Sequence, residues 1–182
     1  MEAALKARTN YVDLGGMFHY TKKQLKLNNE FKKIGRTAIL GMGATPGISN
    51  LLAYYGSQFF SKIKDIDITF IDKDETSYTQ AFVLPYSFKT IIDEYSMKPA
   101  VFRNGKLRFV EPHSGIKEYE SEWGRRTGFL TLHSEIATLP LTLKDKGIKN
   151  CEFRVTFENE FSEIIESLIN LGFASNEKMK FK

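Results

Sequence analysis

The sequence contains one cysteine, Cys151, and three histidines among 182 residues. A single cysteine excludes an intramolecular disulfide and any zinc site built from several cysteines. The histidines, His19, His113 and His133, lie far apart and lack metal-ligand spacing, so no metal site is expected. Cys151 precedes a strand-like segment and is interpreted as a small buried residue. A reducing cytoplasm is the simplest setting for such a chain.

The sequence also lacks long apolar runs, a signal peptide and a strong charge imbalance. No apolar run is long enough to cross a bilayer, so no membrane is expected as a partner. The net charge of +4 is mild, and the lysine clusters show neither interleaved aromatics nor a known nucleic-acid module. Nucleic acid is therefore not expected as a partner either. The last residues, 174–182, are expected to be a partly ordered tail.

The first fifty residues predict one α/β crossover unit. Residues 2–8 are typical of the end of a helix, and 10–16 follow as a short strand ending in Gly-Gly. A lysine-rich helix is predicted at 21–33, and a buried parallel strand at 37–40. An independent domain seldom begins with a truncated helix that leads directly into a strand.

The pattern beyond residue 50 predicts a mixed α+β arrangement. A helix is expected at 48–63 and a strand with one solvated face at 66–71. Asn104-Gly105 suits a type I′ turn and predicts a hairpin between 100–103 and 106–110. The remaining predicted elements are a short helix at 90–95, strands at 117–122 and 151–157, and a helix at 160–171.

A glycine-rich turn, GMGATPG at 41–47, lies between a predicted strand and a predicted helix. This is the context of a dinucleotide fingerprint, but the sixth position is Pro46, where that fingerprint needs glycine. Three interpretations stay open: a pyrophosphate loop, a purely structural tight turn, and a turn that lets the backbone approach a ligand closely. In the third case, Asn50 in the next helix could add a hydrogen-bond donor.

Other candidate site residues each have an ordinary structural explanation. His133 and Glu135 lie two apart, would share a face on a strand, and could bind or deprotonate an amino group. The alternative is a structural histidine with satisfied hydrogen bonds. Arg125 could hold a substrate carboxylate through a bidentate contact, or could simply be an exposed loop arginine. Ser87 could contact substrate, although N-capping of the following helix would also account for it.

Taken together, several segments resemble the saccharopine dehydrogenase family. They are YVDLGG at 11–16, GMGATPGISN at 41–50, YSFKTIIDEY at 86–95, Pro99-Ala100 with Asn104-Gly105-Lys106, and LHSE at 132–135 closed by TLP at 138–140. The resemblance covers about residues 11–172. It implies an α/β to α+β fold. Residues 1–50 would be the terminal strands of a Rossmann-type sheet, and residues 51–182 a mixed-sheet catalytic and dimerisation domain.

The resemblance further implies an oxidoreductase that moves a hydride between NAD(P) and the C–N bond of a lysine-type amino acid. Gly41, Gly43, Pro46 and Gly47 would then face the nicotinamide. Thr45 occupies the position at which saccharopine reductases carry an active-site aspartate, and a threonine cannot act as a general base at neutral pH. This change, together with Gly16 in place of a frequent aromatic, points away from strict saccharopine reductase activity.

Two further expectations follow from the resemblance. The catalytic positions would be His133, Glu135 and Thr45, and the substrate-binding residues Arg125, Asn50 and Ser87, while the partner would be a second copy in a homodimer. Because the cofactor fingerprint is missing, this chain alone is expected to bind no NAD(P) and to be inactive. The alternative function is a non-catalytic dimerisation or ligand-sensing domain.

Overall fold

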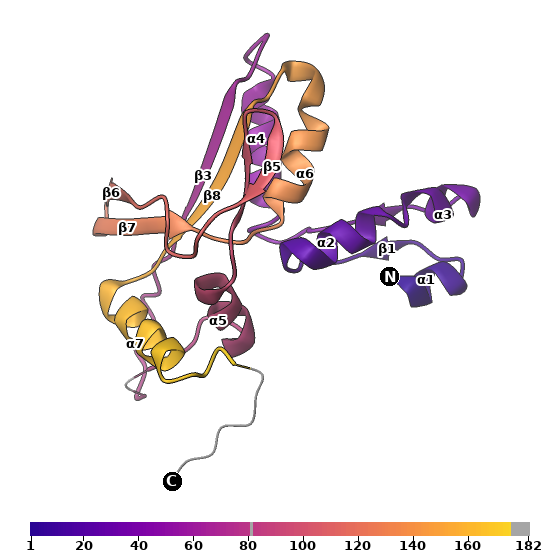
Figure 1. Ribbon diagram of the computed structural model, residues 1–182. Coiled ribbons are helices and arrows are strands. Elements are labelled where there is room, and N and C mark those ends of the chain that lie inside the picture. Colours follow the sequence, from indigo (N-terminus) through magenta and orange to yellow (C-terminus); the bar gives the residue numbers. More distant parts are fainter. Residues whose placement is uncertain (81, 176–182) are drawn as a thin grey trace. The chain divides into compact units, whose positions relative to one another are not determined.

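Six strands of the described chain join in one mostly antiparallel sheet with the order β5-β4-β8-β7-β6, and β3 pairs with β8 (Figure 1). These strands are β3 (Asp65–Ile71), β4 (Ala100–Arg103), β5 (Lys106–Phe109), β6 (Lys117–Ser121), β7 (Gly124–Leu130) and β8 (Asn150–Thr156). Alternating apolar patterns in the sequence explain β3 and β8, and the Asn-Gly turn explains the hairpin of β4 and β5. The predicted mixed fold class is confirmed.

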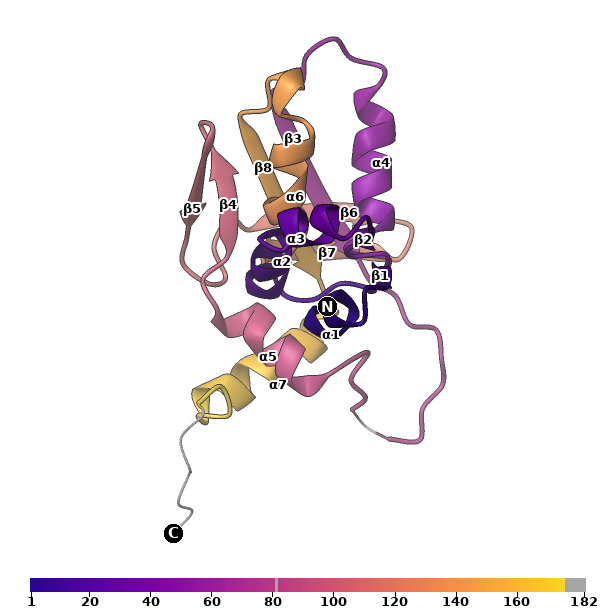
Figure 2. The same cartoon turned by 90° about the vertical axis from the view of Figure 1, so that its right-hand side faces the viewer.

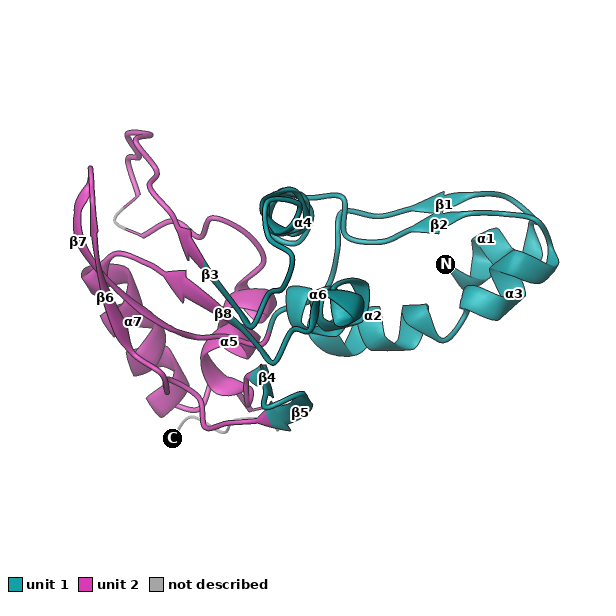
Figure 3. Cartoon of the chain, turned by 90° about the horizontal axis from the view of Figure 1, so that it is seen from above, with its two compact units in different colours: residues 1–68, 100–108, 133–152 teal, residues 69–99, 109–132, 153–182 magenta. Residues whose placement is uncertain are grey.

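The computed structural model describes residues 1–80 and 82–175, so most of the expected C-terminal tail lies outside the described residues. The chain packs as two units (Figure 3). The first contains residues 1–68, 100–108 and 133–152, and the second contains 69–99, 109–132 and 153–182. The boundary that separates the expected domains 1–50 and 51–182 stays a prediction. None of the described helices is long and apolar enough to cross a membrane.

The first unit begins with the predicted parallel crossover. Strands β1 (Tyr11–Val12) and β2 (Ala38–Ile39) pair in parallel, which confirms the predicted parallel pairing. The predicted burial of the second strand is wrong, because Ile39 is exposed. Helices α1 (Glu2–Lys6), α2 (Phe18–Leu25) and α3 (Asn28–Lys33) complete this region.

The single helix predicted at 21–33 is wrong, because the chain forms two shorter helices there. At the break, the Lys26 and Leu27 N–H groups donate to carbonyls three residues earlier, at 3.2 and 3.0 Å. Two asparagines follow, a residue type with low helix propensity. Helix α2 also begins earlier than expected, since Phe18 in its first turn is buried in the core.

The Asp13 carboxylate fastens the end of β1 to the glycine-rich turn and to α2. Its Oδ1 accepts hydrogen bonds from the Gly15 N–H (3.1 Å) and the Gly41 N–H (2.8 Å). Its Oδ2 accepts one from Gln24 Nε2 at 2.6 Å. Burial acts to raise the pKa of Asp13, but these and other hydrogen bonds, with that of Gly41 foremost, outweigh it and hold the pKa below its ordinary value of 3.8.

The core of the first unit forms around α6 (Glu135–Thr142), which packs against α2, against α4 (Ile48–Ser57) and against β4. Apolar side chains of α6 and of the turn after it are buried: Ile136, Ala137, Leu139, Pro140 and Leu143. A short 3-10 turn, η1 (Lys144–Lys146), follows α6. Helix α4 ends six residues before the predicted residue 63, in a turn where the Gln58 N–H bonds the Tyr55 carbonyl.

The second unit packs α5 (Phe88–Ser96) against α7 (Asn159–Asn170). Tyr95 is buried and lies with its ring centroid 4.9 Å from that of Phe129 and 5.8 Å from that of Phe157. Strands β6, β7 and the end of β8 form the sheet of this unit. Between β3 and α5, the described residues 72–80 and 82–87 form neither helix nor strand (Figure 2).

We expect Asp13→Asn to lower the free energy of unfolding by about 1 to 3 kcal/mol, because an amide cannot accept all three hydrogen bonds as a carboxylate does. The folded pKa lies below the unfolded one, so this stabilisation is present above the unfolded pKa and is lost as pH falls through the folded pKa. Urea denaturation between pH 7 and pH 2 would therefore show the two proteins converging in acid.

Asp145→Asn is the matched control, because Asp145 is an exposed aspartate on η1. Its effect should stay within about 0.5 kcal/mol at every pH. A stability difference between wild type and Asp13→Asn that does not change with pH would contradict the anchoring role of the charge.

Candidate functional site

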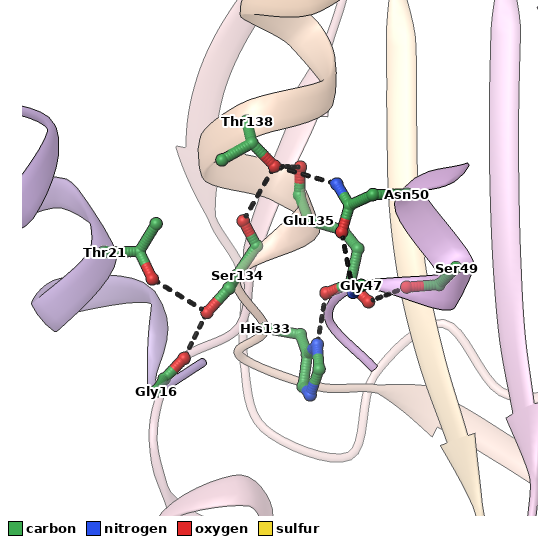
Figure 4. Close-up of polar contacts among 9 residues, drawn as sticks. All are labelled: Gly16, Thr21, Gly47, Ser49, Asn50, His133, Ser134, Glu135 and Thr138. Carbon is green, nitrogen blue, oxygen red and sulfur yellow. Dashed lines mark hydrogen bonds and ion pairs between the residues drawn. The ribbon is translucent and has the colours of Figure 1, made fainter. Parts of the chain in front are cut away.

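Polar side chains from α2, α4 and the start of α6 meet within the first unit (Figure 4). The glycine-rich turn, now seen between β2 and α4, adjoins them. We call this group the polar cluster. Its side chains are those of Thr21, Ser49, Asn50, His133, Ser134, Glu135 and Thr138.

Glu135 lies at the centre of the polar cluster and is completely buried. Its Oε1 accepts a hydrogen bond of 2.5 Å from the Ser49 hydroxyl, and its Oε2 contacts His133 Nδ1. The two residues therefore meet as the sequence suggested, but the predicted strand is wrong. Glu135 is the first residue of α6, and His133 lies in the loop before it. The imidazole therefore reaches the carboxylate from that loop instead of from one face of a strand.

The contacts of Glu135 fix the orientation of the His133 ring. A carboxylate at Nδ1 favours the tautomer with hydrogen on Nδ1 and the lone pair on Nε2. The His133 side chain is 14 % exposed, so the ring is largely shielded from water while its carboxylate partner is fully shielded. A buried carboxylate is tolerated only when its oxygens are bound, and Ser49 and His133 provide those bonds.

Asn50 joins the glycine-rich turn to α6. Its Oδ1 accepts a hydrogen bond from the Gly47 N–H at 3.2 Å, and its Nδ2 donates to Thr138 Oγ1 at 3.0 Å. The predicted hydrogen-bonding residue therefore has protein partners in this conformation. Its role as a substrate contact stays a prediction.

Ser134 connects α6 to α2 and to the end of the β1 segment. Its hydroxyl accepts from Thr21 Oγ1 at 3.1 Å and donates to the Gly16 carbonyl. Ser134 occupies the N-cap position of α6 without making a side-chain cap bond, because its hydroxyl is directed to Gly16. The segment that ends at Gly16 and the glycine-rich turn are thus both linked to the start of α6, the second of them through Asn50.

The glycines of the turn are required by the turn itself. A Cβ on Gly47 would lie 2.0 Å from the Gly43 carbonyl oxygen, and one on Gly43 would lie 2.6 Å from the Leu14 carbonyl oxygen. Gly47 also has φ +133°, which is unfavourable for other residues. Close packing of backbone against backbone therefore explains these glycines without a ligand. The cofactor role of Gly41, Gly43, Pro46 and Gly47 stays a prediction, as does a catalytic role for Thr45.

A small cavity of about 150 Å³ lies beside the turn. Its polar lining includes Gly41, Gly47, Asn50, Ser134 and Thr138. Ligand pockets usually measure about 300 to 1,000 Å³, so this cavity suits one ring or one small polar group and not a whole dinucleotide. The cavity has room for a nicotinamide-sized group, and cofactor binding there stays a prediction.

The other predicted site residues lie in the second unit. Arg125 is on β7 and not in a loop, with Nε 2.9 Å from Glu118 Oε2 and 3.9 Å from Glu120 Oε1. Ser87 is exposed at the N-cap position of α5, where its side chain makes no capping hydrogen bond. Substrate binding by Arg125 and Ser87 stays a prediction.

Sequence reasoning missed four members of the polar cluster: Thr21, Ser49, Ser134 and Thr138. Serine and threonine are common in loops and helix caps, so their identity alone gives no signal. For three of them the available indication was their place within the quoted motifs, with Ser49 in GMGATPGISN, Ser134 in LHSE and Thr138 in TLP.

No protein-family model matches the chain. The chain is 24% identical to the carboxyaminopropylagmatine dehydrogenase of Synechocystis, with 100% of this chain and 47% of that protein covered. It is 22% identical to the carboxynorspermidine synthase of Vibrio alginolyticus, with 98% of this chain and 45% of that protein covered. The saccharopine dehydrogenase (L-Glu forming) of Saccharomyces cerevisiae matches its fold with a TM-score of 0.66 at 14% identity, over 97% of this chain and 41% of that one. The chain is therefore similar in sequence to these two enzymes and in fold to saccharopine dehydrogenase.

The chain spans about half the length of the curated relatives it matches. The resemblance stated from its motifs is confirmed, and the fold agrees with it. Within the residues that the structure describes, no group of three or more His, Cys, Asp or Glu side chains is placed to hold a metal ion.

We expect Glu135→Gln to lower the free energy of unfolding by about 3 kcal/mol. The glutamine NH₂ group would face a hydrogen-bond donor, Ser49 or His133, that bonds a carboxylate oxygen in the wild type. Ser49→Ala should cost about 1 to 2 kcal/mol, and the two changes should not add. Urea denaturation of the single and double variants gives the coupling. Glu30→Gln, at an exposed glutamate of α3, is the control. Additive effects would show that Ser49 and Glu135 do not interact.

Proposed function

We propose that this chain is the substrate-side part of a saccharopine-dehydrogenase-like oxidoreductase that acts on the C–N bond of a lysine-type amino acid. The observation that carries the proposal is the orientation of His133 by the buried Glu135 in the same unit as the glycine-rich turn. Similarity to a dehydrogenase and to the fold of saccharopine dehydrogenase supports the reaction class.

In the proposed mechanism, His133 removes a proton from the substrate amine. Oxidation of a C–N bond to an imine takes a hydride from carbon and a proton from nitrogen, and a nicotinamide, when bound, accepts the hydride. His133 Nε2 is suited to the proton because Glu135 holds the other ring nitrogen. Glu135 stabilises the imidazolium that forms. Thr45 cannot replace an aspartate as base, so His133 is the residue that performs this step.

The proposed cofactor contact is the turn formed by Gly41, Gly43, Pro46 and Gly47. The cavity beside it is large enough for one ring-sized group, and Asn50 keeps the turn in place through Gly47. The rest of NAD(P) needs a phosphate-binding segment, which the turn does not provide. We therefore propose that this chain alone holds NAD(P) weakly or not at all.

The proposed substrate carries an amine and a carboxylate on a flexible chain. The names of the relatives, carboxyaminopropylagmatine dehydrogenase and carboxynorspermidine synthase, describe molecules with both groups. Arg125 would take the carboxylate, with Ser87 as a second contact. Arg125 is about two-thirds exposed, so its guanidinium can exchange its acidic partners for a ligand.

A homodimer in the cytoplasm completes the proposal. Large apolar side chains are exposed along α4 and the turn that follows it: Leu51, Leu52, Tyr55, Phe59 and Phe60. Patches of this kind mark interfaces, and a second copy is a partner that could cover this one. The single cysteine, Cys151, is buried and reduced, which suits a reducing compartment.

The alternative is a non-catalytic dimerisation or ligand-sensing domain. The observation that favours it is the structural use of the glycines, whose space is filled by the turn's own backbone. The two functions differ in what precedes the chain in its gene. A reading frame that continues upstream into a strand and a G-x-G-x-x-G segment would contradict the non-catalytic alternative.

In a protein that joins this chain to its nucleotide-binding part, we expect His133→Gln to lower kcat by about 10² to 10⁴-fold, because it removes the proton acceptor. Binding of the cofactor should be unchanged. NADH absorbance measures the first and calorimetry the second. His19→Gln, at an exposed histidine of α2, should leave both unchanged. A full kcat in the His133 variant would exclude the mechanism.

Calorimetric titration of the 182-residue chain with NADH and with NADPH tests the cofactor proposal. We expect no heat of binding at micromolar concentration, because the turn lacks a fingerprint that could hold the pyrophosphate. Micromolar affinity for either cofactor would show that the chain contains a complete nucleotide site.

A further inference from the structure

The second unit contains a cavity of about 310 Å³ that the proposed oxidoreductase mechanism does not use. Its walls come from residues of the loop between β3 and α5 and from residues at and just before the start of α7. The volume lies at the lower end of the range for small-molecule pockets. All of its lining residues belong to the same unit.

The cavity wall combines carboxylates with aromatic rings. The carboxylates are Asp72, Asp74, Glu158 and Glu160, and the rings are Tyr78, Phe82, Phe157 and Phe161. Three of the rings stack on one another, with the Phe161 centroid 5.3 Å from that of Phe82 and 4.9 Å from that of Phe157. Among the described residues, no lysine, arginine or histidine lines the cavity.

The negative charge of this wall is only partly neutralised. Lys73 and Arg126 approach Glu158, with N–O distances of 3.3 and 3.5 Å. Burial raises the pKa of Asp72, and the charges of Asp74 and Glu158 raise it further. The charges of Asp74 and Glu158 therefore oppose ionisation of Asp72.

The helix dipole of α7 accounts for two of the four carboxylates but not for the other two. Glu158 and Glu160 lie at the helix N-terminus, where the helix dipole favours acidic side chains. Asp72 and Asp74 belong to the loop and have no such stabilisation. Asp74 is held instead by the Tyr78 hydroxyl, which donates to its Oδ2 at 2.6 Å, so one carboxylate and one ring are fixed together.

We propose that this cavity binds an alkylammonium group, meaning a primary ammonium cation on a short apolar chain. Carboxylates attract the cation, aromatic faces stabilise it through their quadrupoles, and the apolar parts of the rings cover the chain. Anions are repelled by the four acids. A divalent metal is disfavoured, since no three acidic or histidine side chains of the described residues converge to coordinate one.

This proposal does not depend on the oxidoreductase function. It rests on the shape and charge of the second unit, whereas the oxidoreductase proposal rests on the polar cluster of the first unit. Loss of amine binding would leave the catalytic proposal untouched, and an inactive His133 variant would leave the amine site untouched.

The test is NMR titration of the full chain with pentylammonium chloride and, separately, with 1-pentanol, which has the same length but no charge. We expect saturable shifts at the Tyr78 and Phe161 amides and about tenfold tighter binding of the ammonium. Equal affinity for the two probes, or no saturable shift with the ammonium up to about 50 mM, would overturn the proposal.

Matched variants distinguish binding in the cavity from attraction by general surface charge. Asp72→Asn combined with Glu160→Gln should weaken ammonium binding about tenfold, and it relieves repulsion, so the fold should be kept. Glu163→Gln removes an exposed charge from the same helix outside the cavity and should change affinity less than about twofold. Equal weakening by Glu163→Gln and by the cavity variant would show non-specific attraction and exclude the site.

Discussion

The buried carboxylate of Glu135 is the interaction on which the first unit depends. It has no contact with water, so its charge requires the Ser49 hydroxyl on one oxygen and His133 on the other. These two bonds fasten the first turn of α4 and the loop before α6 to a single point. The His133 orientation that the catalytic proposal needs is therefore a consequence of how a buried charge is satisfied.

The glycine-rich turn is held from both ends by hydrogen bonds to its backbone. Asp13 binds the Gly41 N–H at its start, and Asn50 binds the Gly47 N–H at its end. Its glycines allow the backbone to fold against itself, which explains a pattern that imitates a phosphate-binding loop. A turn held at both ends beside a small cavity is suited to positioning one part of a ligand.

The two units use acidic side chains differently. In the first unit, Asp13 and Glu135 are surrounded by donors and serve to fix backbone and side-chain positions. In the second, four carboxylates line one cavity, and only part of their charge is neutralised by neighbouring basic groups. A satisfied acid stabilises the fold, whereas a crowded set of acids can gain free energy from a cation, and this difference separates the two proposals.

Local patterns in the sequence determined the Asn-Gly hairpin, the strand before α7, the parallel pairing of the first two strands and the resemblance to saccharopine dehydrogenases. The sequence alone could not determine where α2 begins or the helix that begins at Glu135, because burial of Phe18 and of the apolar face of α6 decided both. Pro140 within α6 also obscured that helix. The partners of Ser49, Thr21 and Asn50 lie 86, 113 and 88 residues away, and only tertiary folding brings such distant hydroxyl, carboxyl and amide groups within hydrogen-bonding distance.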